Sequence, residues 1–215
     1  GMDYLDVYFL HYPPQAGTSM ELAMESINEL KRKGKIRSIG VSNFTLDMLK
    51  EASAYGTVDV IQPCYNLLWR YIDKDILPYC VKENIGVIPY STLAQGLLTG
   101  RFTKDTQITG GRAKAALFQP GVYEECLEVT DALIELGKKY DHSATQICIN
   151  WLVKNPNLTA PIVGGANAEH ALDNLKALDF IMEQEDYKKI DEISSAFCEK
   201  MPEYQLFFDT KVKGE

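Results

Sequence analysis

The chain has 215 residues, of which 46% are hydrophobic and 24% are charged, a balance that fits one soluble globular domain with a substantial core. Its formal net charge of −8 argues against nucleic acid or an anionic membrane as the main partner. No apolar run approaches the roughly 20 residues that cross a membrane, and no signal peptide opens the chain. The 5 cysteines are scattered without CxxC spacing and the 3 histidines lie far apart, so we expect a cytoplasmic protein with reduced thiols and no metal centre.

The first half of the chain alternates short apolar runs with helical patterns. A strand is predicted at residues 4–10 and a helix at 19–33, with Leu22, Ile27 and Leu30 on its apolar side and Gly34 ending it. Thr45 is a plausible N-cap for the helix that follows the second strand. The further elements of this half are a second strand at 36–41, a third at 58–64, a helix at 72–83 and a fourth strand at 85–90.

A longer insertion follows the fourth strand. Residues 99–121 are rich in Gly, Thr and Lys and predict a loop. Ser143 with Gln146 matches a capping box at the start of the second helix after that loop. The remaining elements are helices at 123–140 and 144–153, a fifth strand at 158–163, helices at 168–178 and 184–197, and an irregular tail.

The strands determine the fold class that we predict. Runs such as VIQPC and IGVIPY are almost continuously apolar, which is typical of parallel strands covered by helices. Repeated βα units favour a (β/α) barrel or a doubly wound sheet. A closed eight-stranded barrel needs about 250 residues, and only five strands are predicted here. We therefore expect an α/β fold: one domain over residues 1–215 that forms an incomplete TIM (β/α)8 barrel of about five βα units.

Polar residues follow the predicted strands at their carboxyl ends, where the active site of a (β/α) barrel gathers. Taken singly, each has a structural explanation as a turn, a cap or a core residue. Their occurrence at five successive strand ends favours an active site. The last strand leads into a helix whose free N-terminal amides could hold a phosphate. These residues are His11, Ser42, Asn43, Gln62, Tyr90, Ser91, Gly164, Gly165 and Asn167.

Five motifs occur in order along nearly the whole chain: DYLDVYFLHYP, GKIRSIGVSNF, IQPCYNLLWR, VIPYSTLAQGLLTGRF and GGANAEHALDN. Together they resemble the C-terminal portion of the aldo-keto reductase family, closest to the branch that includes the potassium-channel β subunits. The resemblance implies an oxidoreductase that reduces small aldehydes or ketones with NADP or NAD as cofactor.

The resemblance also implies a role for individual residues. His11 would be catalytic, hydrogen-bonding the substrate carbonyl oxygen, and Tyr90 would stack under the nicotinamide ring. The nicotinamide carboxamide would be fixed by Ser42, Asn43 and Gln62. The pyrophosphate channel would be lined by Ser91, Leu93, Gln95, Gly164 and Ala166. The adenosine end would contact His170, Asp173 and Asn174. Arg101 and Arg112 would either clamp the phosphates or remain solvated loop charges.

Two departures from the family pattern weaken these expectations. The family's histidine acts with an Asp, a Tyr acid and a Lys that precede the strand that opens this chain, and these three are absent here. Tyr4, Tyr8 and Tyr12 lie nearby, but no motif supports any of them as a substitute. The predicted adenosine helix also opens without Arg or Lys, which weakens a strong NADP preference.

Three functions therefore stay open. The chain is a reductase that needs its missing residues from elsewhere and is impaired alone, a non-catalytic nucleotide-binding or interaction protein, or a truncated product without selected activity. An open barrel exposes strand edges and apolar surface, so we expect a homo-oligomer that covers the seam. The alternative cover is the tail with Tyr204, Leu206, Phe207 and Phe208.

Overall fold

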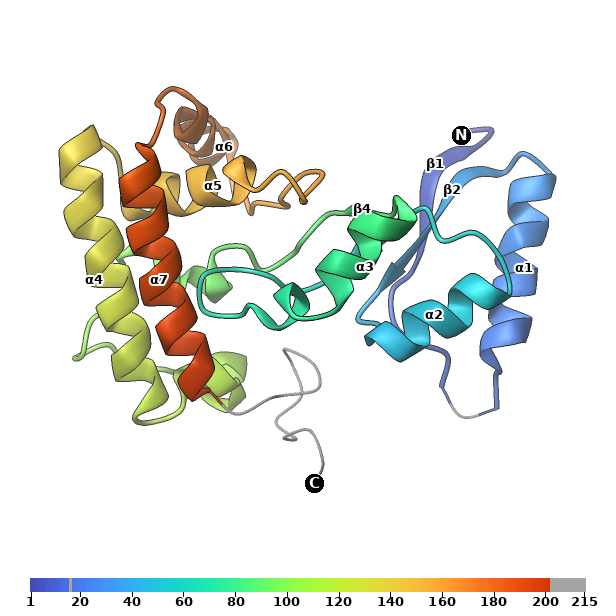
Figure 1. Ribbon diagram of the computed structural model, residues 1–215, viewed down its shortest axis with the longest axis horizontal. Helices are drawn as coiled ribbons and strands as arrows, with labels where there is room; N and C mark the ends of the chain where they lie inside the picture. Colours follow the sequence, from blue (N-terminus) through green and yellow to red (C-terminus); the bar gives the residue numbers. More distant parts are fainter. Residues whose placement is uncertain (16, 202–215) are drawn as a thin grey trace. The chain divides into compact units, whose positions relative to one another are not determined.

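The computed structural model describes residues 1–15 and 17–201 (Figure 1). These residues form two compact units. Unit 1 comprises residues 1–63, 72–89 and 157–160, and unit 2 comprises residues 64–71, 90–156 and the described residues from 161 onward. The tail residues that were considered as a cover lie outside the described residues. The single domain predicted from composition stays a prediction, and the two units are described separately below.

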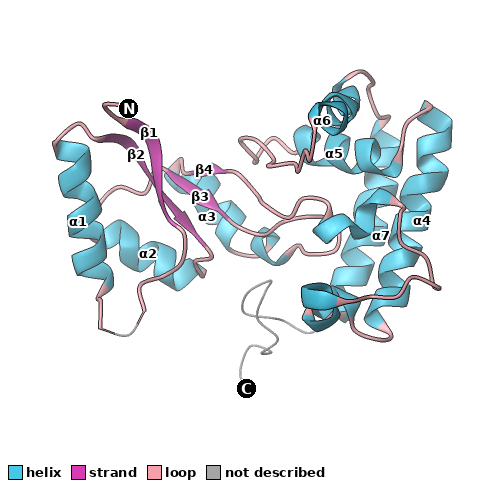
Figure 2. Cartoon of the chain, turned by 180° about the vertical axis from the view of Figure 1, so that it is seen from behind, coloured by secondary structure: helices cyan, strands magenta, loops and turns pink. Residues whose placement is uncertain are grey.

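Unit 1 is an α/β unit built on a parallel sheet of four strands in the order β1-β2-β3-β4, drawn in magenta in Figure 2. The strands are β1 (Leu5–Leu10), β2 (Ile36–Ser42), β3 (Val60–Gln62) and β4 (Gly86–Val87). The helices are α1 (Met20–Arg32), α2 (Leu46–Ala54) and α3 (Ile76–Glu83). The strand order follows the chain order, as expected for successive βα units.

Local signals explain where these helices begin and end. Thr45 caps α2 as predicted, since its hydroxyl accepts a hydrogen bond from the Met48 amide. Gly34 follows α1 with a φ of +68°, a left-handed conformation that glycine adopts without strain. Ile27 is buried as predicted, but the prediction for Leu22 was wrong: it is 54% exposed, and α1 buries Met20 and Met24 together with Ile27.

The sheet is buried at β2 and exposed at β1. Ile39 and Val41 of β2 are fully buried. In β1, Leu5, Val7 and Tyr8 are each about 40% exposed, and adjacent strand residues point to opposite faces. Within the described residues β1 pairs with β2 alone, so the sheet presents an apolar open edge. The parallel α/β class is confirmed, while the incomplete barrel stays a prediction.

Unit 2 is mainly helical. Its helices are α4 (Val122–Tyr140), α5 (Ala144–Lys154), α6 (Ala168–Leu175) and α7 (Gln184–Lys200). Short 3-10 segments are η2 (Ala94–Thr99), η3 (Gly110–Lys114), η4 (Ala116–Phe118) and η5 (Lys176–Leu178); η1 (Tyr71–Asp73) joins the two units in sequence. Helix α4 packs against α5 and α7, and Leu133 of α4 and Trp151 of α5 are fully buried. The capping box of Ser143 and Gln146 at the start of α5 is confirmed.

The prediction of a fifth strand at residues 158–163 was wrong. The segment carries no strand in the structure. The Thr159 amide donates to the Val87 carbonyl oxygen over 2.8 Å, and the Thr159 hydroxyl accepts from the Val87 amide over 3.0 Å, but this pairing ends there. Pro161 lacks the amide hydrogen that the next rung of a ladder requires. The segment is therefore part of the loop that joins α5 to α6 in Figure 1.

Candidate functional site

In unit 1, three strand ends are tied together by the polar residues that the sequence singled out. The Ser42 hydroxyl donates to the Gln62 carbonyl oxygen over 2.7 Å. The Asn43 side-chain amide donates to the His11 carbonyl oxygen over 2.9 Å and to the Ser42 hydroxyl over 3.2 Å. Ser42 and Asn43 are both buried. The ends of β1, β2 and β3 thus form one hydrogen-bonded cluster, as their parallel arrangement predicts.

The His11 side chain is exposed beside this cluster. Its imidazole lies 5.0 Å from the Tyr12 ring, centroid to centroid, at a tilt of 42°. The backbone of His11 is held by Asn43, whose own φ of +61° lies in the left-handed region that asparagine tolerates better than most residues. The chain therefore fixes the position of this residue while leaving its ring accessible to a reactant.

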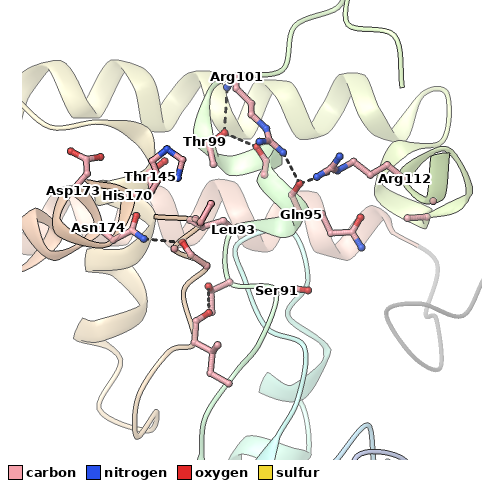
Figure 3. Close-up of a pocket in the computed structure, with 18 of the residues that line it drawn as sticks. Ser91, Leu93, Gln95, Thr99, Arg101, Arg112, Thr145, His170, Asp173 and Asn174 are labelled. Atoms are coloured by element: carbon pink, nitrogen blue, oxygen red, sulfur yellow. Dashed lines mark hydrogen bonds between the residues drawn. The ribbon is translucent and has the colours of Figure 1, made fainter. Parts of the chain in front are cut away.

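In unit 2, a pocket of about 1250 Å³ lies between the segment of η2 and η3 and the start of α6 (Figure 3). Its lining contains most of the cofactor residues predicted from the sequence. Those that line it are Ser91, Leu93, Gln95, Arg101, Arg112, Gly164, Ala166, His170, Asp173 and Asn174.

Two arginines converge on one carbonyl at the η2–η3 side of the pocket. Arg101 donates to the Gln95 carbonyl oxygen over 3.4 Å, and Arg112 donates to the same oxygen over 3.2 Å. Gln95 and Gly96 both have positive φ values, +55° and +98°. The φ of Gly96 would strain any residue with a Cβ, which favours glycine here, and a Cβ would also have to displace the Arg101 guanidinium. Each guanidinium keeps further N–H donors for an anion in the pocket.

The other side of the pocket is built by α6 and the segment before it. The Asn167 side chain caps α6 by accepting from the His170 amide over 2.8 Å. The Asn174 side chain donates to the Gly164 carbonyl oxygen over 3.0 Å, which holds the glycine turn against the helix. The Thr92 hydroxyl donates to the Ile162 carbonyl oxygen over 2.7 Å and joins the two sides.

The remaining predicted residues lie outside the pocket. His11, Ser42, Asn43 and Gln62 belong to unit 1. Tyr90 belongs to unit 2, where its backbone forms an isolated parallel β-bridge with that of Cys64. It does not line the pocket. Sequence reasoning missed Lys114 and Thr145, which do line the pocket. The proximity of Lys114 to Arg112 in a basic loop was a signal for the first, whereas only the fold reveals the second.

Within residues 1–15 and 17–201, no cluster of His, Cys, Asp or Glu could hold a metal ion. Nor does any helix in those ranges have the length and apolar character needed to span a membrane.

Comparison with known proteins identifies the family. The model of the Aldo/keto reductase family matches residues 1–195, and this chain belongs to that family. It is 34% identical to the NADH-specific methylglyoxal reductase of Escherichia coli over 91% of this chain and 61% of that protein. It is 28% identical to a probable voltage-gated potassium channel subunit beta of Arabidopsis thaliana over 84% of this chain and 58% of that protein.

A solved structure supports the same assignment. The glycerol dehydrogenase from Gluconobacter oxydans superposes with a TM-score of 0.81 at 28% identity, covering 91% of this chain and 60% of the other. The chain thus spans about three fifths of the length of the relatives it matches. The family resemblance, including the relation to a potassium-channel β subunit, is confirmed.

Proposed function

We propose that this chain binds a nicotinamide dinucleotide and contributes to the reduction of small aldehydes or ketones. The observation that carries the proposal is the unit 2 pocket, in which Arg101 and Arg112 converge beside Gln95. Two guanidinium groups at one rim suit a pyrophosphate, whose oxygens accept charge-assisted hydrogen bonds. The volume of about 1250 Å³ accommodates the adenosine diphosphate half of such a molecule.

The unit 1 cluster, taken by itself, carries the groups that a nicotinamide carboxamide requires. Ser42, Asn43 and Gln62 combine hydroxyl and amide groups at adjoining strand ends, and a carboxamide requires both donors and acceptors. A reduced nicotinamide, when bound, supplies hydride. His11, exposed and held through its backbone, would donate a hydrogen bond to the carbonyl oxygen that accepts the developing charge.

We further propose that this chain is a poor catalyst by itself. The alkoxide formed from the substrate carbonyl needs a proton. The family resemblance assigns that step to an Asp, a Tyr and a Lys, and no motif in these 215 residues matches them. Loss of a positioned acid costs roughly 10²- to 10⁴-fold in rate. The alternative is a non-catalytic nucleotide-binding or interaction role, which follows if no other chain supplies the missing acid. The similarity to a probable channel subunit favours interaction with a partner chain.

A titration of the purified chain with NADH and NADPH, followed by fluorescence and calorimetry, tests the binding proposal. We expect saturable binding of at least one of them with a Kd in the micromolar range, which corresponds to a binding free energy of about −8 kcal/mol. Absence of saturation up to about 1 mM nucleotide would contradict the proposal, because a Kd of about 1 mM corresponds to a binding free energy of only about −4 kcal/mol. With a standard aldehyde, turnover near the ordinary enzymatic value of about 10 s⁻¹ would contradict the predicted impairment.

We also propose that the chain forms a homo-oligomer through β1. Leu5, Val7 and Tyr8 expose apolar surface on both faces of a strand whose outer edge has no partner within the described residues. Such an edge pairs readily with another strand. Sedimentation should detect a dimer, and Val7→Lys should weaken it, with the exposed Val81→Lys on α3 as the control. A monodisperse monomer would contradict this proposal.

A further inference from the structure

The charged side chains of the unit 2 pocket are segregated. Its basic residues, Arg101, Arg112 and Lys114, come from the segment that contains η2 and η3. Among the described residues that line the α6 side, the charged one is Asp173, and no Lys or Arg occurs there. Figure 3 shows the two arginines around Gln95, with Asp173, His170 and Asn174 gathered on the other side. One end of the pocket therefore suits an anion better than the other.

The carboxylate of Asp173 is fixed in its place. The Gln146 side-chain amide donates over 3.1 Å both to the Asp173 backbone carbonyl oxygen and to its Oδ1. Gln146 is itself buried and belongs to the capping box of α5. Since the same residue orders a helix start and holds Asp173, the negative charge cannot easily rotate out of the pocket.

The nearest cation does not neutralise the negative charge on the α6 side of the pocket. Lys176 donates to Asp173 Oδ1 over 3.0 Å, but its side chain is 60% exposed and it does not line the pocket. Exposed pairs of this kind are weak and screened by salt. Within the described residues the hydrogen bonds to this carboxylate end on Oδ1, so Oδ2 keeps its capacity to accept from a hydroxyl or amino group. The Asn167 side chain is engaged in capping α6.

A phosphate monoester on the ribose carries a charge of about −1.5 to −2 near pH 7 and requires cations or several donors. A free ribose hydroxyl is neutral and can donate to a carboxylate, as acidic residues do in other dinucleotide sites. We propose that the α6 side of this pocket selects a dinucleotide whose adenosine ribose is unphosphorylated, so that the chain prefers NAD(H) to NADP(H). This inference rests on the proposed nucleotide-binding function.

The direct test compares ADP-ribose with 2′-phospho-ADP-ribose by calorimetry on the full chain. Both probes lack nicotinamide, so their binding does not depend on the cluster in unit 1. We expect ADP-ribose to bind about tenfold more tightly, a difference that narrows as added salt screens the carboxylate. Equal binding, or tighter binding of the phosphorylated probe, would overturn the inference and leave the nucleotide site standing. Failure of both probes to bind would overturn the site as well.

Two substitutions test the cause of the preference. Asp173→Asn keeps the shape of the side chain and removes its charge. The ratio of the affinity for ADP-ribose to that for 2′-phospho-ADP-ribose should therefore fall about threefold. Asn167→Arg supplies a cation at the start of α6 and should shift the ratio by about tenfold toward the phosphorylated probe. Asp131→Asn makes the same chemical change on the exposed face of α4, outside the pocket, and should leave the ratio unchanged. Unchanged ratios in both pocket variants, with circular dichroism confirming the fold, would overturn the proposal.

Discussion

The side-chain amide of Asn43 donates a hydrogen bond to the backbone carbonyl oxygen of His11 over 2.9 Å. It joins the residue after β2 to the residue after β1, so the proposed catalytic position is fixed by a neighbouring strand end. The same asparagine has a φ of +61°, which a residue with an ordinary Cβ adopts only at a cost. Asn43 thus serves the fold and the proposed site together.

Two substitutions of Asn43 separate its hydrogen bond from its backbone conformation. Asn43→Gly loses the amide but tolerates the positive φ, and should cost about 1 kcal/mol in the free energy of unfolding. Asn43→Ala loses the amide and also strains the backbone, and should cost about 1 kcal/mol more. Urea denaturation followed by circular dichroism measures both. Equal midpoints for the two variants would show that the conformation contributes nothing.

The two arginines of the pocket should each contribute to nucleotide affinity. Arg101→Gln and Arg112→Gln each remove a charge beside the Gln95 carbonyl, and each should weaken ADP-ribose binding about fivefold, the effect of about 1 kcal/mol for an exposed charge-assisted contact. Arg32→Gln on α1 is the control, since that arginine is exposed and belongs to unit 1. If all three variants bind alike, Arg101 and Arg112 are solvated loop charges.

Local capping signals were predictable from the sequence, whereas strand lengths were not. Thr45 and the pair Ser143–Gln146 cap helices as predicted, because their side chains bond to backbone amides a few residues away. By contrast, β3 ends at Gln62 before Pro63, and the fifth strand fails at Pro161. A proline interrupts the hydrogen bonding between strands even in an apolar run.

The residues that line the pocket were predictable where a local sequence motif contains them, and not where tertiary packing brings them together. Residues such as Gln95 and Asn174 belong to contiguous motifs that resemble a known family, and they do line it. Thr145 lines it because α5 packs close to α6, a tertiary relationship that no local pattern encodes. The hold of Gln146 on Asp173 was equally invisible, since 27 positions separate the two residues.

Acid should weaken the contact between α4 and α7 through Asp186. Lys139 donates to its Oδ2 over 2.7 Å and Tyr140 over 2.5 Å, and these hydrogen bonds hold the pKa of Asp186 below its usual value. A carboxyl whose pKa is lower in the folded state contributes stability above its unfolded pKa of about 3.9, and that contribution is lost as the pH falls through the lower folded value. Asp186→Asn should therefore destabilise the protein at pH 7 and flatten the fall in melting temperature below about pH 4. An unchanged acid profile, measured beside Asp131→Asn, would contradict this.

The cysteines should differ in reactivity according to their burial. Cys64, Cys80, Cys126 and Cys148 are buried, whereas Cys198 is partly exposed. Burial raises the pKa of the Cys80 thiol to about 12, so the reactive thiolate is on the order of 10⁻⁴ of the population at pH 8. We expect iodoacetamide at pH 8 to modify Cys198 first and Cys80 at least about 100-fold more slowly, with mass spectrometry of the peptides as the readout. In urea the difference should disappear, because it arises from the folded core. Rapid modification of Cys80 in the native protein would mean that α3 opens locally, which would place unit 1 among the weakly protected parts of the chain.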